Sequence, residues 1–296
     1  MAKFTEQTLT NWTKPPSDTE ESKLENAERM VREAISEDET LKSKSTETFG
    51  QGSYANNTNV KNNSDIDINV RYTDGFYYNI PKNKSKEDFG LGNPSTYSYS
   101  EFKDDVETAL VNKFGRSDVV RNDKCITIKE NSYRVETDVV PTWNYRRYSE
   151  NGNYVLGSKF MTDSYKWVIN YPKQHIENGI DKNKKTSRRF KRLTRLHKKI
   201  RYKMIDDGLT VNSNIKSFLL ECLVWNVPNN IFDDYDTWNE RLKQSIIFLY
   251  QNTKEQDTCN EWGEVSELIY LIRDSRKWTR KDINDYLLQL WNYLEY

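Results

Sequence analysis

Two aspartates separated by a single residue are the strongest chemical signal in this chain of 296 residues. Asp65 and Asp67 belong to the run Asp-Ile-Asp-Ile-Asn-Val, in which polar and apolar residues alternate as in a β-strand. Residues i and i+2 of a strand point to the same face, so the two carboxylates are expected side by side. Adjacent carboxylates repel each other unless a cation lies between them. Oxygen ligands of this kind suit Mg²⁺ or Mn²⁺ rather than zinc.

A third acid lies in a later strand-like run, Val-Glu-Thr-Asp-Val-Val over residues 135–140. Asp138 is flanked by β-branched residues, and Glu136 shares its face and is a rival ligand. Three carboxylates can hold two metal ions about 3.5–4 Å apart. One ion then activates an attacking hydroxyl, and the other steadies a triphosphate and its leaving pyrophosphate. A lone Asp-X-Asp is usually a solvated strand face, and the third acid favours a catalytic site instead.

Eleven residues separate the dipeptide Gly52-Ser53 from Asp65, and the dipeptide follows a strand-like stretch, 46–49. Glycine has no side chain, so phosphate can approach the backbone closely at this turn. The Ser53 hydroxyl and neighbouring N–H groups can then hold phosphate oxygens. Gly52 and Ser53 are therefore candidate nucleotide-binding residues.

The elements that position these residues divide the chain into two parts. We expect an N-terminal helix capped by Ser17 or Asp18, with Leu24 and Ile35 at the two ends of its apolar face. The alternation and turn signals predict a mixed α/β lobe over 1–170 and a helical lobe over 171–296. The first lobe is expected to contain a helix near 100–114 and strands at 119–120, 126–128 and 133–140, the last ending at Pro141. Helices are expected at about 186–206, 214–225, 236–251, 262–273 and 280–294.

Composition excludes several classes of protein. The chain has 45 basic and 45 acidic residues, so its net charge gives no general attraction to nucleic acid or membranes. With 8 Trp, 19 Tyr and 11 Phe it is too aromatic for a disordered chain. Three scattered cysteines and two histidines argue against a disulfide framework and a zinc site. No leader-like or membrane-spanning apolar run is present, and we expect a cytoplasmic protein.

These motifs resemble the nucleotidyltransferase superfamily of DNA polymerase beta, and most closely its bacterial cyclic GMP-AMP synthase/DncV-like branch, the signal makers of anti-phage CBASS systems. The resemblance lies in three segments around the acids and three later ones, at 50–54, 64–67, 136–141, 172–179, 182–183 and 217–221. It implies an α+β fold with a polymerase-beta-like core of mixed sheet and helices, a C-terminal helical lobe and an N-terminal spine helix. It also implies that Asp65, Asp67 and Asp138 hold two metal ions and that Ser53 contacts the donor triphosphate.

The resemblance assigns further residues to the nucleotides. Lys198, or Lys199 if the helix register shifts by one, and Ser217 are expected to grip the triphosphate. Phe218 matches a position where relatives stack a base, although a core phenylalanine is the alternative. Asn170 lies where an Asn reads uracil in some relatives, although a coincidental Asn is the alternative.

A basic run from Lys182 to Lys203 holds 12 Lys or Arg in 22 residues and no acid. Its apolar residues recur at helical spacing, which predicts one amphipathic helix. A charge run is usually a solvated face, but an excess of cations can also bind nucleic acid. Arg188, Arg189 and Arg192 are therefore candidate contacts for an activating RNA, whereas His197 is expected to be a packed helix residue.

The expected function is a metal-dependent enzyme that joins ATP and a second nucleoside triphosphate (GTP, UTP or ATP) into a cyclic di- or trinucleotide, with release of pyrophosphate. One alternative is a transferase that moves a nucleotide onto a tRNA end or an antibiotic. A second alternative is an inactive nucleotide- or RNA-binding module that keeps the fold.

Overall fold

The computed structural model describes residues 3–15, 18–60, 65–273 and 276–296. The chain forms two compact units. The sheet unit comprises residues 17–54 and 64–173, and the helical unit comprises residues 1–16, 55–63 and 174–296. Two short segments far from the C-terminal helices in sequence are thus grouped with them, and the chain passes between the units four times.

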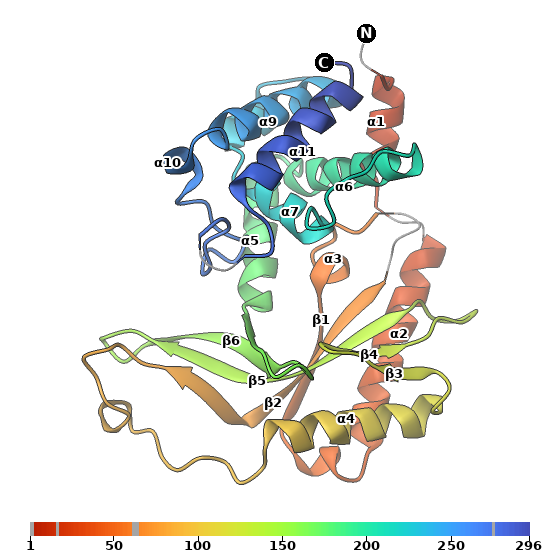
Figure 1. The fold of residues 1–296 in the computed structure, drawn as a ribbon. Helices are drawn as coiled ribbons and strands as arrows, with labels where there is room; N and C mark the ends of the chain where they lie inside the picture. Colours follow the sequence, from red (N-terminus) through yellow and green to blue (C-terminus); the bar gives the residue numbers. More distant parts are fainter. Residues whose placement is uncertain (1–2, 16–17, 61–64, 274–275) are drawn as a thin grey trace. The chain divides into compact units, whose positions relative to one another are not determined.

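The sheet unit is built on seven strands in which the order β1-β2-β5-β4-β3 is extended by β6 on β5 and β7 on β6. The central strands β2 and β5 run parallel and lie side by side, while the other pairs are antiparallel (Figure 1). This mixed sheet with helices confirms the predicted α+β class. The strands are β1 (Thr46–Gln51), β2 (Ile66–Asn79), β3 (Val119–Arg121), β4 (Ile126–Ile128), β5 (Thr137–Tyr148), β6 (Tyr154–Met161) and β7 (Trp167–Asn170).

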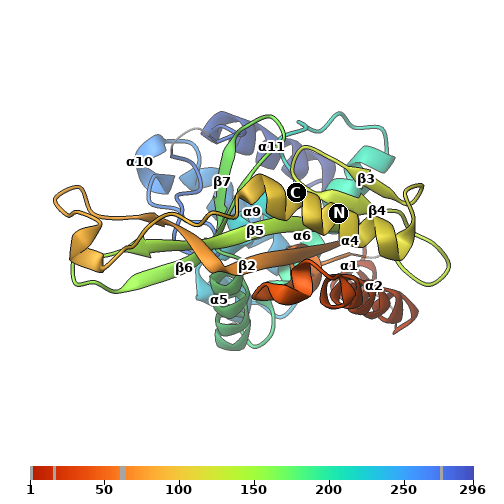
Figure 2. The same cartoon turned by 90° about the horizontal axis from the view of Figure 1, so that it is seen from below.

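Two helices cover one face of this sheet, α2 (Asp18–Glu37) and α4 (Tyr99–Phe114) (Figure 2). The apolar residues of α2 recur at helical spacing and are buried with Ile66 and Ile68 of β2. A capping box of Ser98 and Glu101 begins α4. The helix predicted to be capped by Ser17 or Asp18 is α2, which begins at Asp18; Ser17 lies outside the described residues. Shorter helices are η1 (Leu41–Ser43), α3 (Gly52–Ala55) and η2 (Glu87–Phe89).

The prediction that a strand ends at Pro141 was wrong, because β5 continues through it to Tyr148. At residues 140–142 this strand is paired with β2 alone, since β4 pairs only as far as Val139 and β6 begins to pair at Trp143. Proline has no N–H to donate, but no strand pairs with β5 on the side away from β2 at this level. No ladder hydrogen bond is therefore lost on that side. The Pro141 carbonyl accepts a hydrogen bond from the Tyr99 hydroxyl instead.

The helical unit packs its helices around a core that includes Leu196, Leu219, Leu223 and Leu287. This confirms the helical C-terminal part, while α1 and α5 were not predicted. The helices are α1 (Glu6–Trp12), α5 (Pro172–Lys185), α6 (Phe190–Asp206), α7 (Ser217–Trp225), α8 (Asn229–Asp233), α9 (Trp238–Asn252), α10 (Gln256–Cys259) and α11 (Arg280–Tyr293).

Two helix predictions in this unit were wrong. The basic run is broken between α5 and α6, because Ser187 and Arg188 adopt positive φ angles of 50° and 62°. The Thr186 hydroxyl accepts a hydrogen bond from the N–H of Phe190, the first residue of α6. Residues 262–273 form no helix; the Asn226 side chain instead bonds both backbone groups of Gly263.

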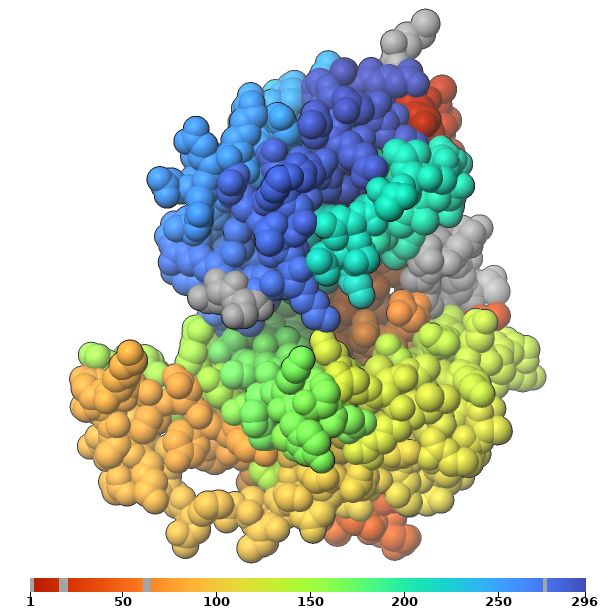
Figure 3. Space-filling view, in the orientation of Figure 1, coloured from red at the N-terminus to blue at the C-terminus, as the bar shows by residue number. Residues whose placement is uncertain are grey.

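The segment between β2 and α4 is mostly exposed. In the filled-atom view an opening separates part of this orange-to-yellow segment from the rest of the sheet unit (Figure 3). Among the described residues, no helix has both the length and the apolar character that crossing a membrane requires.

Candidate active site

The pairing of β2 with β5 brings the predicted acids to one face of the sheet. Asp67 is the register partner of Asp138, so the two side chains leave adjacent parallel strands at the same level. Asp65 lies two residues before Asp67 and shares its face. Glu136, the rival ligand, is exposed and precedes β5, where its carbonyl accepts the Ile66 N–H. The pairing therefore favours Asp138 over Glu136 as the third acid.

The charge of one acid affects the pKa of groups beside it. The pKa of Asp65 is raised because neighbouring atoms desolvate its carboxyl group and because the charge of Asp138 repels a second negative charge. Burial, together with the charges of Asp138 and Asp67, raises the pKa of the Cys125 thiol to about 12. The Thr127 hydroxyl donates a hydrogen bond to Oδ1 of Asp138 and fixes that carboxylate on the sheet. This face concentrates negative charge.

Gly52 makes room for one of these carboxylates. Its φ is +66°, and a Cβ at this position would lie 2.0 Å from Oδ2 of Asp67. Gln51, the last residue of β1, is the register partner of Asp67, so the Gly-Ser turn follows directly beside the acid. Ser53 is partly buried on α3. The glycine thus allows the serine turn and the acidic face to approach each other.

The donor set fits a divalent cation, since it consists of carboxylate oxygens that repel one another. The backbone at Gly52 lies so close to the Asp67 carboxylate that any side chain at position 52 would collide with it. Within the described residues, no three His, Cys, Asp or Glu side chains are gathered closely enough to hold an ion as they stand. The structure therefore brings the acids to a common face but does not arrange them as a finished coordination sphere.

Three residues predicted to contact the nucleotide lie in the helical unit. Ser217 begins α7, and its hydroxyl lies 3.1 Å from that of Tyr202. Phe218 follows and is 42% exposed, with its ring beside those of His175 and Trp278. Lys198 is only 2% exposed, and its ammonium group bonds neighbouring side chains. Ser217 and Phe218 are accessible in the helical unit, whereas Lys198 reaches a phosphate only if its present bonds open.

The residues predicted to read a base or bind RNA are mainly on the surface. Asn170 ends β7, is exposed, and pairs with Ser158 of β6. Arg188 and Arg192 are exposed, whereas Arg189 forms an ion pair with Asp233.

A buried polar cluster in the helical unit was not predicted. Glu221 is 3% exposed although its neighbours Leu220 and Cys222 are apolar. A single acid inside an apolar helix of this kind was the available signal, since a buried carboxylate needs partners. Its partners come from distant parts of the sequence, which no local pattern specifies.

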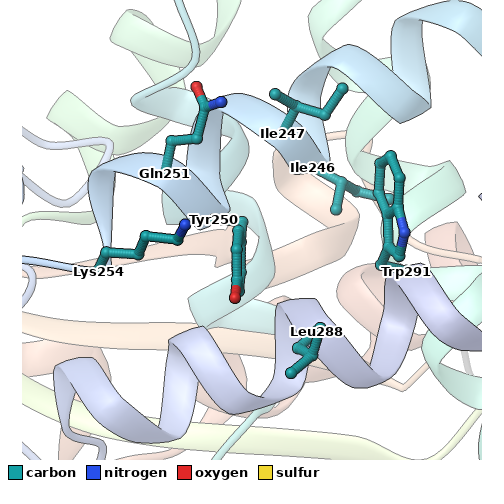
Figure 4. A pocket seen from close by; sticks show the side chains of 7 residues that line it. All are labelled: Ile246, Ile247, Tyr250, Gln251, Lys254, Leu288 and Trp291. Atoms are coloured by element: carbon teal, nitrogen blue, oxygen red, sulfur yellow. The ribbon is translucent and has the colours of Figure 1, made fainter.

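The helical unit also has an apolar cavity of about 230 Å³ between α9 and α11. Ile246 and Tyr250 line it from α9, and Leu288 and Trp291 line it from α11 (Figure 4). Among the described residues that line it, Lys254 alone is charged. This cavity carries none of the chemistry expected of the acids.

Comparison with known proteins decides the family. Residues 177–295 match the model of the cGAS/DncV-like nucleotidyltransferase C-terminal helical domain. A cyclic dipyrimidine nucleotide synthase of Cecembia lonarensis is 73% identical over all of both chains. A cyclic dipyrimidine nucleotide synthase of Legionella pneumophila is 37% identical, over 98% of each chain. The chain belongs to the cGAS/DncV-like nucleotidyltransferases.

The fold of a solved member agrees with this assignment. The cyclic dinucleotide synthase CdnE of Elizabethkingia meningoseptica, determined with GTP and Apcpp, matches with a TM-score of 0.82 and 36% identity. The match covers 99% of this chain and all of that one. The protein is therefore an enzyme of the cGAS/DncV-like family that joins nucleoside triphosphates into a cyclic nucleotide, as predicted. The family works with divalent metal ions, and the all-oxygen face around Asp67 and Asp138 is consistent with this.

Family membership also decides between the alternatives left open by the sequence. Relatives that match the chain over 98–100% of its length are cyclic nucleotide synthases, which argues against a transferase for a tRNA end or an antibiotic. The cyclic nucleotide synthases among the full-length relatives also argue against an inactive binding module.

Proposed function

We propose that this nucleotidyltransferase joins two pyrimidine nucleoside triphosphates, UTP or CTP, into a cyclic dinucleotide. Two relatives that match the whole chain act as cyclic dipyrimidine nucleotide synthases, which supports this choice. Asn170 supports it independently, because an exposed amide offers both a donor and an acceptor to the edge of a pyrimidine. ATP, which the sequence suggested as one substrate, is the competitor against which this proposal is tested.

The observation that carries the catalytic part is the register pairing of Asp67 with Asp138. In each step a 2′- or 3′-hydroxyl oxygen of one nucleotide bonds to the α-phosphorus of the other. The bond from that phosphorus to pyrophosphate breaks, and the hydroxyl proton is released. A second step closes the ring. Two Mg²⁺ or Mn²⁺ ions, when bound by Asp65, Asp67 and Asp138, would acidify the hydroxyl and neutralise the leaving pyrophosphate.

The remaining predicted residues bind and orient the nucleotides in this proposal. Gly52 and Ser53 contact the donor triphosphate through backbone N–H groups and a hydroxyl. Ser217 and Lys198 contribute from the helical unit, the lysine after leaving its buried partners. The exposed ring of Phe218 stacks on a base, which is worth about 1–3 kcal/mol per base.

The substrate assignment is tested by incubating the protein with labelled UTP, CTP, ATP or GTP, singly and in pairs, with Mg²⁺ or Mn²⁺. We expect a phosphatase-resistant product that requires a pyrimidine triphosphate, with a mass equal to that of a cyclic dipyrimidine. Asp138→Asn is the inactive control. A product formed from purine triphosphates alone, with no incorporation of UTP or CTP, would overturn the pyrimidine assignment.

A role in anti-phage signalling in the cytoplasm, with an activating RNA, completes the proposal. Arg188, which precedes α6, and Arg192, on α6, are exposed and are the contacts we assign to RNA, with Arg189 joining them if its ion pair opens. Reversing the three charges should abolish stimulation by added RNA and leave the RNA-independent rate unchanged. Stimulation that survives the reversal would reject this surface.

A further inference from the structure

A buried carboxylate joins three distant parts of the helical unit. Oε2 of Glu221 accepts hydrogen bonds from the Thr58 hydroxyl at 2.7 Å and the Lys198 ammonium at 2.7 Å. Its Oε1 lies 3.0 Å from Nε2 of His175. The Thr58 hydroxyl also accepts from Lys198 at 2.9 Å. Burial alone raises the pKa of Glu221, but Lys198 and His175 outweigh it and hold that pKa well below its usual range.

A buried cation on the same helix binds two further backbone segments. Arg195 precedes Lys198 by three residues on α6 and is 5% exposed. Its Nε donates to the Thr13 carbonyl at 2.7 Å, and its Nη1 donates to the carbonyl of Asn57 at 2.5 Å and to the Asn57 side chain at 3.2 Å. Within the described ranges no carboxylate pairs with this guanidinium. Burial and the neighbouring charge of Arg192 lower the Arg195 pKa to about 10.

The guanidinium also holds a backbone conformation that is rarely adopted. Asn57 has a φ of 50°, in the left-handed region, where asparagine is tolerated better than other residues with a side chain but still at a cost. Such a conformation persists only where surrounding contacts determine it. The two bonds from Arg195 supply that constraint.

All the bound segments adjoin places where the chain passes between the two units. These places are 16/17, 54/55, 63/64 and 173/174. Thr13 precedes the first, Asn57 and Thr58 lie between the second and third, and His175 follows the fourth. Two cations of α6 and one acid of α7 therefore bond described residues in each of the three segments that make up the helical unit.

We infer that Arg195, Thr58 and Glu221 are positioning residues for nucleotidyl transfer. The helix α3, which carries Ser53, begins in the sheet unit and ends at Ala55, the first residue of the segment that the cluster anchors. A fixed 55–60 segment fixes the end of the turn that is proposed to bind the triphosphate. This inference rests on the proposed role of Ser53, and a misplaced binding group of this kind costs about 100-fold in rate when it moves by about 1 Å.

The sharpest test is a matched pair of substitutions at Thr58, which is fully buried. Thr58→Val keeps the shape and removes the hydroxyl, whereas Thr58→Ser keeps the hydroxyl. Glu221 retains Lys198 and His175 in both variants, so both should fold. Thr194→Val is the control, because Thr194 is equally buried on α6 and its hydroxyl bonds, among the described residues, only the Phe190 carbonyl of its own helix. Lys198 is left unchanged, since a contact with the triphosphate is proposed for it.

Amide hydrogen exchange and steady-state kinetics are measured on each full-length variant. For Thr58→Val we expect about 10-fold faster exchange over residues 55–60 and about a 10-fold lower kcat/KM, the change that about 1.4 kcal/mol produces. Thr58→Ser and Thr194→Val should match the wild type in both measurements. Arg195→Met, measured in the same way, should accelerate exchange over 3–15 as well.

The inference is overturned if Thr58→Val keeps the exchange and kcat/KM of the wild type, or if Thr58→Ser loses as much as Thr58→Val. These outcomes are distinct from failure of the proposed function. In that case Ser53→Ala would retain full activity, while exchange over 55–60 would still respond to the loss of the Thr58 hydroxyl.

Discussion

Asp67 and Asp138 occupy paired positions on the parallel strands β2 and β5, and Gln51 of β1 pairs with Asp67 on its other side. Adjacent parallel strands hold paired side chains on one face, so the separation of the two acids is set by the backbone ladder rather than by a flexible loop. The Gly52-Ser53 turn begins one residue after Gln51. Three strands therefore converge on the acids and the serine turn.

Removing one of these acids should abolish turnover without unfolding the protein. Asp138→Asn keeps an oxygen that can accept the Thr127 hydroxyl and deletes one negative charge. We expect kcat to fall at least about 1,000-fold, equivalent to about 4 kcal/mol of transition-state stabilisation. The melting temperature without metal should stay the same or rise, because a repulsion between carboxylates is relieved. Turnover by Asp138→Asn, or by the double variant Asp65→Asn with Asp67→Asn, would show that the site lies elsewhere.

A methyl group at Gly52 should reduce activity more than one at a glycine of similar φ. Gly52→Ala forces an alanine into φ +66° and directs its Cβ at Oδ2 of Asp67. We expect a loss of stability of about 1–2 kcal/mol and a loss of activity of about 100-fold, since the acid or the turn must move. Gly90→Ala is the control, with φ +62° and open space around the new Cβ. It should lose similar stability and keep its activity. Equal activities of the two variants would contradict the steric role of Gly52.

The acids could be predicted from sequence because their arrangement is local. Asp65 and Asp67 obey the strand period, and Asp138 lies in a run of β-branched residues. The continuation of β5 through Pro141 could not be predicted in the same way, because it depends on which neighbours the strand has at that level. The partners of Glu221 are distant for the same reason. They include Thr58, which is 163 residues away, and only the folded chain brings the two together.

His197 should make stability depend on pH between about 4 and 6.5. Its imidazole is fully buried, which lowers its pKa to about 4, and its Nε2 bonds the Ser245 hydroxyl at 2.9 Å. In this pH range His197 binds a proton in the unfolded chain but stays neutral in the folded chain. The folded state therefore keeps this stability above pH 6.5 and loses it as the pH falls towards 4. A difference of this size corresponds to about 3 kcal/mol.

The measurement is urea denaturation of wild type and His197→Gln at several pH values. The variant has no imidazole at this position, while His175 remains in both proteins. We expect the wild type to lose up to about 3 kcal/mol more than the variant between pH 6.5 and 4. Parallel curves would show that His197 is not held neutral by the fold.

Phe218 should affect substrate binding more than stability. The ring is 42% exposed beside His175 and Trp278, so little packing is lost when it is removed. Phe218→Ala should raise the KM for nucleotide by about 5- to 150-fold, equivalent to the 1–3 kcal/mol of a stacked base, with a melting temperature close to that of the wild type. Phe218→Tyr keeps an aromatic face and should restore the KM. Phe190→Ala is the contrasting control, because Phe190 is fully buried and its loss should cost about 3–5 kcal/mol of stability. An unchanged KM in Phe218→Ala would leave the ring as a packing residue at the surface and would remove the base-stacking role from the proposal.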